Sequence, residues 1–244
     1  MITATIFDLD GTLLKTEQLK AISYAKAAVQ LCPYTITESE VIEAFKSVVG
    51  LSRHEVATAL VERFDLTAEA SKHMAEFGVS TAWQAYVQIR LKIYHAMLDD
   101  PVVIRQNQWA HNVDVLNAAR EQGCKTALAT MSHCEQVSRI LGILAWKDRF
   151  DFVATRDDVE HGKPDPEIYR LVAHTLTVAP ENCLVLEDSA VGVQAALNAG
   201  MNVVAVSTDF THKQLHALEG LDPQWIVDDP QQVLGVVQRR LTSA

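Results

Sequence analysis

The chain has 244 residues, of which 48% are hydrophobic and 21% are charged, and its formal net charge is −10. This composition is ordinary for globular proteins and excludes a collagen-like, coiled-coil or globally disordered chain. A chain of this length can bury a large core without a disulfide scaffold, as one large domain or two small ones. The excess of acidic residues argues against a nucleic acid or an anionic membrane surface as a partner.

The cysteines and the N-terminus indicate a protein of the cytoplasm. No two of the four cysteines have C-x-x-C spacing, so we expect reduced thiols and no zinc or disulfide site. The first residues, MITATIFDLDG, lack the basic segment and apolar stretch of a signal peptide. No apolar run approaches the ~20 residues that a membrane span needs.

Short β-branched or apolar segments recur along the chain, and most of them end in polar residues. Such segments are typical of buried strands. They predict six strands: residues 3–7, 125–130, 150–155, 183–188, 202–206 and, more weakly, 225–227. Segments with apolar residues at helical spacing lie between them, including 137–144 and 168–176, and a last helix is expected from Pro230 onward.

Alternating strands and helices of this length predict βαβ units, a mainly parallel sheet and helices on both of its faces. In such sheets, ligands bind outside the carboxyl ends of the strands. The polar residues that end the predicted strands should therefore meet at one edge.

Residues 16–98 differ, because they contain helical patterns and no clear buried strand. One apolar stripe comprises Val41, Ile42, Phe45, Val48 and Val49. A longer one comprises Trp83, Tyr86, Val87, Arg90, Tyr94 and Met97, most of it core by expectation. This segment is predicted to be an all-helical insertion after the first strand, and Asp99-Asp100-Pro101 should mark the return of the chain to the sheet.

Asp8 and Asp10 come directly after the first predicted strand, and Gly11 lets the chain turn there. Two carboxylates this close repel one another unless a cation or a proton lies between them. One is suited to act as a nucleophile toward phosphorus and the other as a general acid and base. A turn stabilised by an aspartate side chain is the alternative, and the tetrapeptide alone does not decide between the two.

Three further polar sites fall at or beside predicted strand ends. Thr130 ends the second strand, Lys163 lies in a proline-containing loop before a helix, and Glu187 and Asp188 end the fourth strand. Each has a structural explanation of its own, as a solvated loop lysine or as carboxylates at a helix start. Their joint position at one sheet edge favours an active site.

In order and spacing, these residues resemble the four motifs of the haloacid dehalogenase superfamily, and the resemblance covers nearly the whole chain. Asp10 is the residue that separates phosphoryl-transfer members of that superfamily from its dehalogenases. The insertion resembles the helical cap of subfamily I. The resemblance implies a Rossmann-like catalytic core of residues 1–15 and 99–244 and a cap domain of residues 16–98.

The resemblance implies a Mg²⁺-dependent phosphatase that hydrolyses a small phosphomonoester, such as a sugar phosphate, through an aspartyl phosphate on Asp8. Asp10 would first donate and then accept a proton. The carboxylates of Asp8 and Asp188 and the backbone carbonyl of Asp10 would hold Mg²⁺. The transferring phosphoryl group would bind to Thr130, Ser132 and Lys163. Glu187 would support the site by holding another ligand or by binding the metal through water.

Within the cap, the segment Gly50-Leu51-Ser52-Arg53 resembles the loop that reaches over the substrate in the beta-phosphoglucomutase-like branch of the superfamily. This resemblance implies that Arg53 binds a second anionic or hydroxylated part of the substrate. Lys15 and Lys20 stand where that branch usually has acidic and histidine side chains, which counts against a mutase. The residues Trp109-Ala110-His111-Asn112 replace the usual Pro-Gly before the next helix, and we interpret this as a change of local loop structure without catalytic meaning.

Outside these motifs, His212 and His216 are four residues apart, a spacing that places both on one helical face and can bind zinc. The sequence offers neither an H-E-x-x-H pattern nor an evident third ligand, so we do not expect a metal site there.

Three other functions stay open from the sequence. A phosphosugar mutase of the beta-phosphoglucomutase type shares all four motifs and is the main alternative. A phosphonate hydrolase would need a Schiff-base lysine in the cap, for which Lys20, Lys46 and Lys92 are candidates. A regulatory module that has kept only the fold is disfavoured because every catalytic position is filled. The expected partner is a small phosphorylated metabolite, and the sequence leaves the oligomeric state open.

Overall fold

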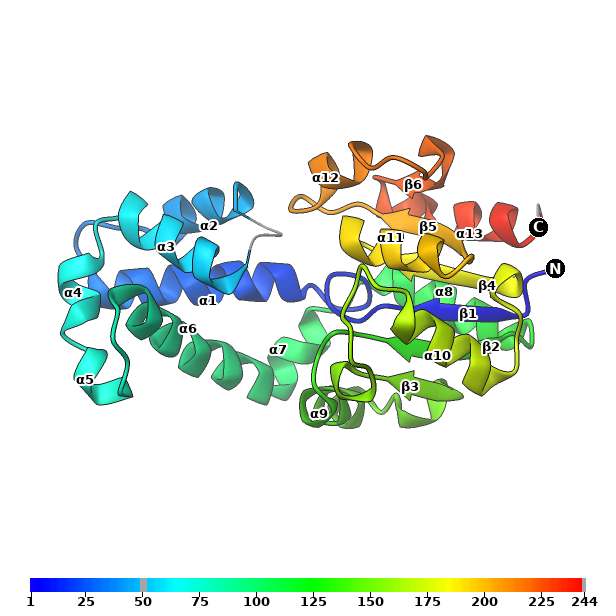
Figure 1. The fold of residues 1–244 in the computed structure, drawn as a ribbon, viewed down its shortest axis with the longest axis horizontal. Helices are drawn as coiled ribbons and strands as arrows, with labels where there is room; N and C mark the ends of the chain where they lie inside the picture. Colours follow the sequence, from blue (N-terminus) through cyan, green and yellow to red (C-terminus); the bar gives the residue numbers. More distant parts are fainter. Residues whose placement is uncertain (49–51, 243–244) are drawn as a thin grey trace. The chain divides into compact units, whose positions relative to one another are not determined.

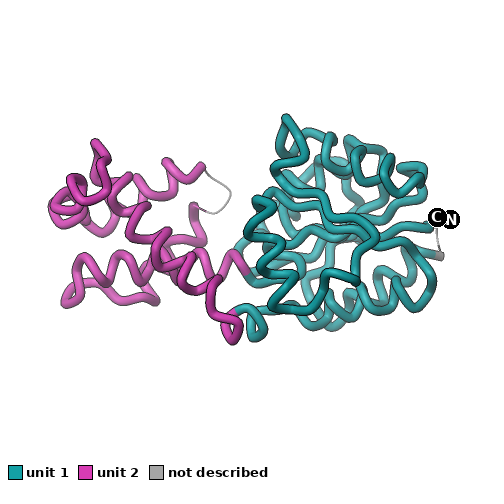
Figure 2. The backbone as a smooth tube through the Cα atoms, turned by 90° about the horizontal axis from the view of Figure 1, so that it is seen from below, with its two compact units in different colours: residues 1–15, 104–244 teal, residues 16–103 magenta. Residues whose placement is uncertain are grey.

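The computed structural model describes residues 1–48 and 52–242. The chain divides into two compact units, one formed by Met1–Lys15 with Ile104–Ala244 and the other by Thr16–Val103 (Figure 2). The second unit extends beyond residue 98, where the sequence predicted its end. The reason is local: Pro101 begins a further helix, α7 (Pro101–Gln106), instead of leading straight to the sheet.

All six predicted strands are present in the larger unit, with ends within two residues of the prediction. They are β1 (Ala4–Phe7), β2 (Lys125–Ala129), β3 (Phe152–Ala154), β4 (Cys183–Glu187), β5 (Asn202–Val206) and β6 (Ile226–Val227). They form one parallel sheet in the order β3-β2-β1-β4-β5-β6 (Figure 1). This is the Rossmann-like α/β fold that the sequence predicted.

The register of the central strands aligns the ends of three chain segments. Phe7 of β1 lies opposite Leu128 of β2 on one side and Leu186 of β4 on the other. Asp8 and Glu187 come directly after Phe7 and Leu186, and Thr130 comes two residues after Leu128, so the residues that the sequence singled out arrive at the same edge of the sheet. All four residues of β1 are buried, as expected for a central parallel strand that is covered on both faces.

Helices cover both faces of this sheet: α10 and α11 pack together in front of it in Figure 1, and α8, which packs with α13, lies behind. The helices of the unit are α8 (Ala110–Glu121), α9 (Cys134–Leu144), α10 (Glu167–Leu176), α11 (Ala190–Asn198), α12 (His212–His216) and α13 (Val233–Thr242). Short 3₁₀ turns are η1 (Lys147–Arg149), η2 (Arg156–Asp158), η3 (Pro180–Asn182), η4 (Pro223–Trp225) and η5 (Pro230–Gln232).

The smaller unit contains only helices among its described residues, as predicted for the cap. They are α1 (Thr16–Leu31), α2 (Glu38–Lys46), α3 (Arg53–Arg63), α4 (Thr67–Ser71), α5 (Met74–Phe77) and α6 (Ala82–Asp99). Its core is aromatic: the ring centroid of Tyr24 lies 5.5 Å from that of Phe45 and 5.7 Å from that of Tyr86. The Tyr86 hydroxyl donates to the Tyr24 carbonyl at 2.8 Å, which joins α6 to α1.

The two apolar stripes predicted in the cap correspond to α2 and α6. Val41 and Phe45 of α2 are buried, whereas Ile42 and Val48 are half-buried and Val49 lies outside the described residues. In α6, Tyr86, Val87, Arg90 and Tyr94 are buried, and Trp83 and Met97 are half-buried. No helix within residues 1–48 and 52–242 has the length and apolar character needed to span a membrane.

Candidate active site

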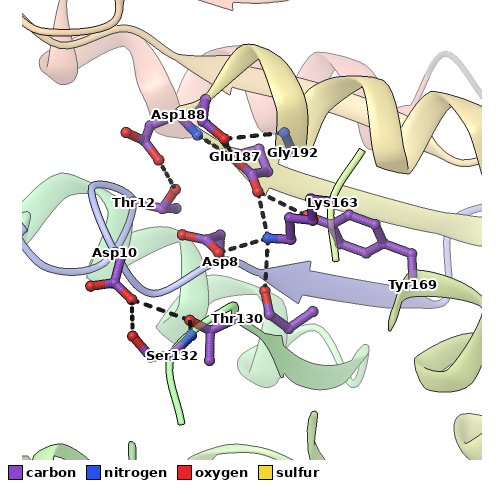
Figure 3. A network of polar contacts seen from close by, with 12 residues as sticks. Asp8, Asp10, Thr12, Thr130, Ser132, Lys163, Tyr169, Glu187, Asp188 and Gly192 are labelled. Carbon is purple, nitrogen blue, oxygen red and sulfur yellow. Dashed lines mark hydrogen bonds and ion pairs between the residues drawn. The ribbon is translucent and has the colours of Figure 1, made fainter. Parts of the chain in front are cut away.

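The centre of the site is one ammonium group shared by two carboxylates. Lys163 Nζ lies 2.7 Å from Asp8 Oδ1 and 2.6 Å from Glu187 Oε1, and it donates a third hydrogen bond to the Ala129 carbonyl at 3.0 Å (Figure 3). The side chains of Asp8, Lys163 and Glu187 are 7%, 4% and 1% exposed. All three N–H groups of Lys163 are thus used by protein acceptors in this arrangement. The second oxygen of Asp8 points away from Lys163 (Figure 3) and accepts no hydrogen bond from the described residues.

Glu187 is held on both of its oxygens. The Tyr169 hydroxyl donates to Oε1 at 3.1 Å, beside Lys163. Oε2 accepts from the backbone N–H groups of Asp188 and Ser189 and from the Ser189 hydroxyl, each at 3.0 Å. A carboxylate with so many donors is fixed in place, which suits Glu187 to orienting Lys163 rather than to binding a ligand itself.

Helix α11 begins close to this carboxylate, and only a glycine fits there. The Ser189 hydroxyl caps the helix by accepting from the Gly192 N–H at 3.1 Å. A Cβ on Gly192 would lie 1.8 Å from Glu187 Oε1. The absence of a side chain at this position is therefore what lets the helix start against Glu187.

Asp10 lies on the other side of Asp8 in Figure 3 and contacts two hydroxyls. Its Oδ2 accepts from Ser132 Oγ at 2.6 Å and from Thr130 Oγ1 at 3.2 Å. The Ser132 N–H in turn donates to Thr130 Oγ1 at 3.1 Å. The structure thus brings both predicted hydroxyls to the site, where they orient Asp10.

Asp188 faces the loop that follows β1. Its Oδ1 accepts from the Thr12 hydroxyl at 3.2 Å. Gly11 has φ +88°, and a Cβ there would lie 2.1 Å from Asp188 Oδ2. Glycine is needed at this position both for the backbone conformation and for the close approach of the carboxylate. The Asn112 side chain supports the same loop, because its Nδ2 donates to the Thr12 carbonyl at 2.6 Å. The residues Trp109–Asn112, which the sequence led us to interpret as a loop change, form the start of α8, and Asn112 has a structural task beside the site.

The electrostatics follow from burying two carboxylates beside one cation. Burial is the main reason that the pKa of Asp8 is raised to about 8. The charges of Glu187 and Asp10 act in the same direction, and Lys163 opposes them. Burial alone would lower the pKa of Lys163, but Asp8 and Glu187 raise it well above its usual range, so this lysine keeps its proton. The two carboxylates of Asp8 and Glu187 thus share a single cation, Lys163.

The donor set fits a hard divalent cation. One oxygen each from Asp8, Glu187 and Asp188 lie within 4.8 Å of one another. Oxygen ligands are those that Mg²⁺ prefers, and it usually binds through one or two carboxylates together with water and substrate oxygens. Because Glu187 is occupied by its own donors, Asp8 and Asp188 are the carboxylates suited to direct contact with such an ion.

In the cap, the structure places Arg53 at the start of α3, where Ser52 and Glu55 form a capping box. Gly50 and Leu51 lie outside the described residues. Arg90 of α6 is 5% exposed, and its guanidinium carbon lies 4.3 Å from the ring centroid of Tyr94 and 4.8 Å from that of Tyr24. Burial lowers the pKa of Arg90, and the charge of Arg53 acts in the same direction, so the two cations lie within electrostatic range of each other.

Comparison with known proteins agrees with this geometry. The family model of haloacid dehalogenase-like hydrolases matches residues 2–200. The chain belongs to the haloacid dehalogenase-like hydrolase family. It is 33% identical to YhcW of Bacillus subtilis, a protein named as a phosphatase, over 86% of each chain. It is 29% identical to the phosphorylated carbohydrates phosphatase of Thermotoga maritima, over 81% of this chain and 82% of that one.

Among solved structures, a Thermotoga maritima protein named as a beta-phosphoglucomutase superposes with a TM-score of 0.70 at 25% identity. The match covers 98% of this chain and 99% of that one. This hydrolase is therefore an enzyme of the phosphatase and phosphomutase group.

Sequence reasoning missed the roles of Tyr169, Gly192 and Asn112, which support the site in the larger unit of this hydrolase. In the cap unit it missed that Arg90 is a buried cation packed against two tyrosines. Glycine in the third position of a helix is the one local signal that was available, because glycine is unfavourable there without a packing reason. The others look like ordinary helix residues, and their partners are distant in the sequence.

Substitution of Gly192 by alanine should destabilise the protein by about 2–3 kcal/mol or more, because the new Cβ overlaps a carboxylate that five donors hold in place. Gly235→Ala is the matched control: it also lies in a helix, and a Cβ at that position would meet no atom within 4 Å. That variant should be neutral or more stable by about 0.5–1 kcal/mol. Urea unfolding of both variants tests this, and equal effects would contradict the role of Gly192.

Without divalent cations, the Asp8 carboxyl should make stability fall as the pH rises from about 5 to 8. The pKa of Asp8 is about 8 in the folded protein and 3.8 for the free side chain, so in this range the folded state binds the extra proton. Asp8→Asn removes this contribution. The stability of the variant relative to the wild type should improve by about 1–3 kcal/mol between these pH values.

The measurement is urea unfolding of wild type and Asp8→Asn in EDTA at several pH values. The comparison cancels the titration of all groups that the two proteins share. A stability difference that does not change with pH would contradict the raised pKa. Adding Mg²⁺ should stabilise the wild type at pH 8 more than the variant.

Proposed function

We propose that this hydrolase is a Mg²⁺-dependent phosphatase that hydrolyses a small phosphomonoester through an aspartyl phosphate on Asp8. The observation that carries the proposal is the asymmetric environment of the Asp8 carboxylate. One oxygen is held by Lys163, and the other has no hydrogen bond from the described residues. A buried carboxylate that is oriented on one oxygen and available on the other is suited to nucleophilic attack.

In the first step, Asp8 attacks phosphorus and the bond between phosphorus and the leaving oxygen breaks. Asp10 donates a proton to the departing alkoxide, so that a neutral alcohol leaves. In the second step, Asp10 takes a proton from water, and the resulting hydroxide attacks phosphorus. The Asp8–phosphorus bond breaks, which returns the carboxylate and releases inorganic phosphate.

Binding of the phosphoryl group exchanges hydrogen bonds that are already present. Lys163, Thr130 and Ser132 each donate to a protein carboxylate in this arrangement. A phosphoryl oxygen would accept from them in place of Asp8 or Asp10, and this exchange would free the Asp10 carboxyl for proton transfer. Asp8, the Asp10 backbone carbonyl and Asp188 would hold Mg²⁺, which supplies positive charge against the repulsion between a carboxylate and a phosphate.

Two arginines of the cap are the reason to propose a substrate with a second anionic or hydroxylated group, such as a sugar phosphate. Arg90 is buried, and its Nε has no hydrogen-bond partner among the described residues. Arg53 lies within electrostatic range of Arg90, and a guanidinium is suited to pairs of hydroxyl or phosphate oxygens. The relative named for phosphorylated carbohydrates agrees with this class of substrate.

A phosphosugar mutase is the second candidate, favoured by the structural similarity to a protein named as a beta-phosphoglucomutase. In that reaction the aspartyl phosphate passes its phosphoryl group to a sugar hydroxyl instead of water. Lys20 favours the phosphatase, because it pairs with Glu17 at 2.7 Å where the resemblance would have placed a histidine. A phosphonatase is disfavoured, because Lys20, Lys46 and Lys92 are each engaged in an ion pair with a glutamate of the cap.

Asp8→Asn should abolish turnover while the fold stays intact, because an amide cannot form the phosphoenzyme. Asp10→Asn should slow turnover by about 10²–10⁴-fold by removing proton transfer. It should leave Mg²⁺ binding largely in place, since the expected ligand there is a backbone carbonyl. The measurement is phosphate release from a panel of phosphomonoesters with Mg²⁺ and with EDTA, with circular dichroism as the check of folding.

Asp157→Asn is a matched control, because this exposed aspartate of the same unit accepts hydrogen bonds from His133 and Cys134 and should retain wild-type turnover when replaced. Wild-type turnover by Asp8→Asn would overturn the mechanism. In the same assay, conversion of β-glucose 1-phosphate to glucose 6-phosphate without phosphate release would favour the mutase.

Arg53→Gln should raise KM at least about tenfold for a substrate that carries a second phosphate or several hydroxyls, and should change KM little for phenyl phosphate. Arg90→Lys keeps a positive charge at residue 90 and should raise KM for the same substrates by a smaller factor. Arg63→Gln, at the end of the same helix α3, is the control. Equal effects of Arg53→Gln on both kinds of substrate would contradict a role in recognising the second group.

A further inference from the structure

A second cluster of ligating side chains lies at the same edge of the sheet, beyond β5, and it shares no residue with the site described above. His212 and His216 occupy the two ends of α12, and their ring centroids lie 4.4 Å apart. Both rings face Asp228, which follows β6. His216 Nε2 lies 2.9 Å from Asp228 Oδ1 and His212 Nε2 lies 3.7 Å from the same oxygen. The third ligand that the sequence did not reveal is thus supplied by the next strand.

The separations fit a small tetrahedral ion. Two ligands at about 2.0–2.1 Å from a tetrahedral zinc ion lie about 3.3 Å from each other. The two nitrogen–oxygen distances of 2.9 and 3.7 Å bracket this value, and all three ligand atoms lie within 4.8 Å of one another. Small side-chain rotations are enough to bring the three atoms to one ion.

The surroundings of Asp228 suit it to binding a metal ion. Ser207, which is buried directly after β5, donates its backbone N–H to the Val227 carbonyl at 2.8 Å and so fixes the backbone that carries Asp228. The two histidines and Asp228 are exposed to solvent, with side-chain exposures of 54%, 36% and 49%, so an ion can reach them and water can complete its coordination.

We propose that His212, His216 and Asp228 form a binding site for a divalent transition metal, with zinc as the best match. Two imidazoles and one carboxylate are ligands that zinc accepts and that Mg²⁺, which prefers oxygen, does not favour. The two metal sites of this protein therefore differ in chemistry as well as in position. A bound ion would join α12 to the segment after β6 and hold this end of the sheet together.

The test is a titration of the intact protein with Zn²⁺ by calorimetry, in excess Mg²⁺ so that the carboxylate site is occupied. The wild type should bind Zn²⁺ at this site, and the ion should raise its thermal midpoint by several degrees. His212→Ala, His216→Ala and Asp228→Asn should each weaken binding at least about a hundredfold and remove the thermal shift.

Two controls separate this site from other histidines and from the catalytic chemistry. His161→Ala removes an exposed histidine that also pairs with one carboxylate, Glu167, and should leave Zn²⁺ binding unchanged. Asp188→Asn, which alters the carboxylate site, should also leave Zn²⁺ binding at the histidine site unchanged. Zn²⁺ binding that persists undiminished in both His212→Ala and His216→Ala would overturn the proposal, as would an equal loss in His161→Ala. Phosphate release by His216→Ala in Mg²⁺ should equal that of the wild type, so the outcome is independent of the proposed function.

Discussion

The ammonium of Lys163, shared by Asp8 and Glu187, is the interaction on which the rest of the site depends. Burying an unpaired carboxylate is costly, and two carboxylates beside one cation are compensated only in part. The remaining hydrogen bonds serve the same need: Tyr169, Ser189 and two backbone N–H groups all donate to Glu187. The negative charge that remains falls on Asp8 and Asp188, on the side of the cluster away from Lys163, where a divalent cation would neutralise it (Figure 3).

The topology of the sheet explains why these residues meet. β1 lies between β2 and β4 in the sheet. The carboxyl ends of these three strands, which carry Asp8, Thr130 and Glu187, are therefore neighbours although the residues are far apart in the sequence. Lys163 comes from the loop before α10 and reaches across the end of β2, where it donates to the Ala129 carbonyl. The Ala129 carbonyl thus holds the Lys163 ammonium at the end of β2, and Asp8 and Glu187 hold it from their own strands.

The strands, the helical insertion and the motif residues could be predicted because their signals are local. Buried parallel strands have continuous apolar sequences, and the motif residues follow strands directly. Tyr169, Asn112 and Arg90 could not be found this way, because each lies in a regular helical pattern and gains its role only from a partner across the fold. Asp228 was missed as a ligand for the same reason: the Asp228-Asp229 pair is typical of a loop, and only the pairing of β5 with β6 brings it to His216.

The hydrogen bonds of the site also explain how it could accept an anion without a prior opening of the fold. Every donor that a phosphoryl group would use already has a carboxylate acceptor: Asp8 for Lys163, and Asp10 for Thr130 and Ser132. Exchanging one oxygen acceptor for another changes the free energy little, whereas leaving a buried donor unpaired costs about 1–3 kcal/mol. The carboxylates therefore keep the donors in place before substrate binds. In the proposed mechanism, a phosphoryl group that replaced Asp10 on the two hydroxyls would release that carboxyl for proton transfer, so binding and the preparation of the general acid would be one event.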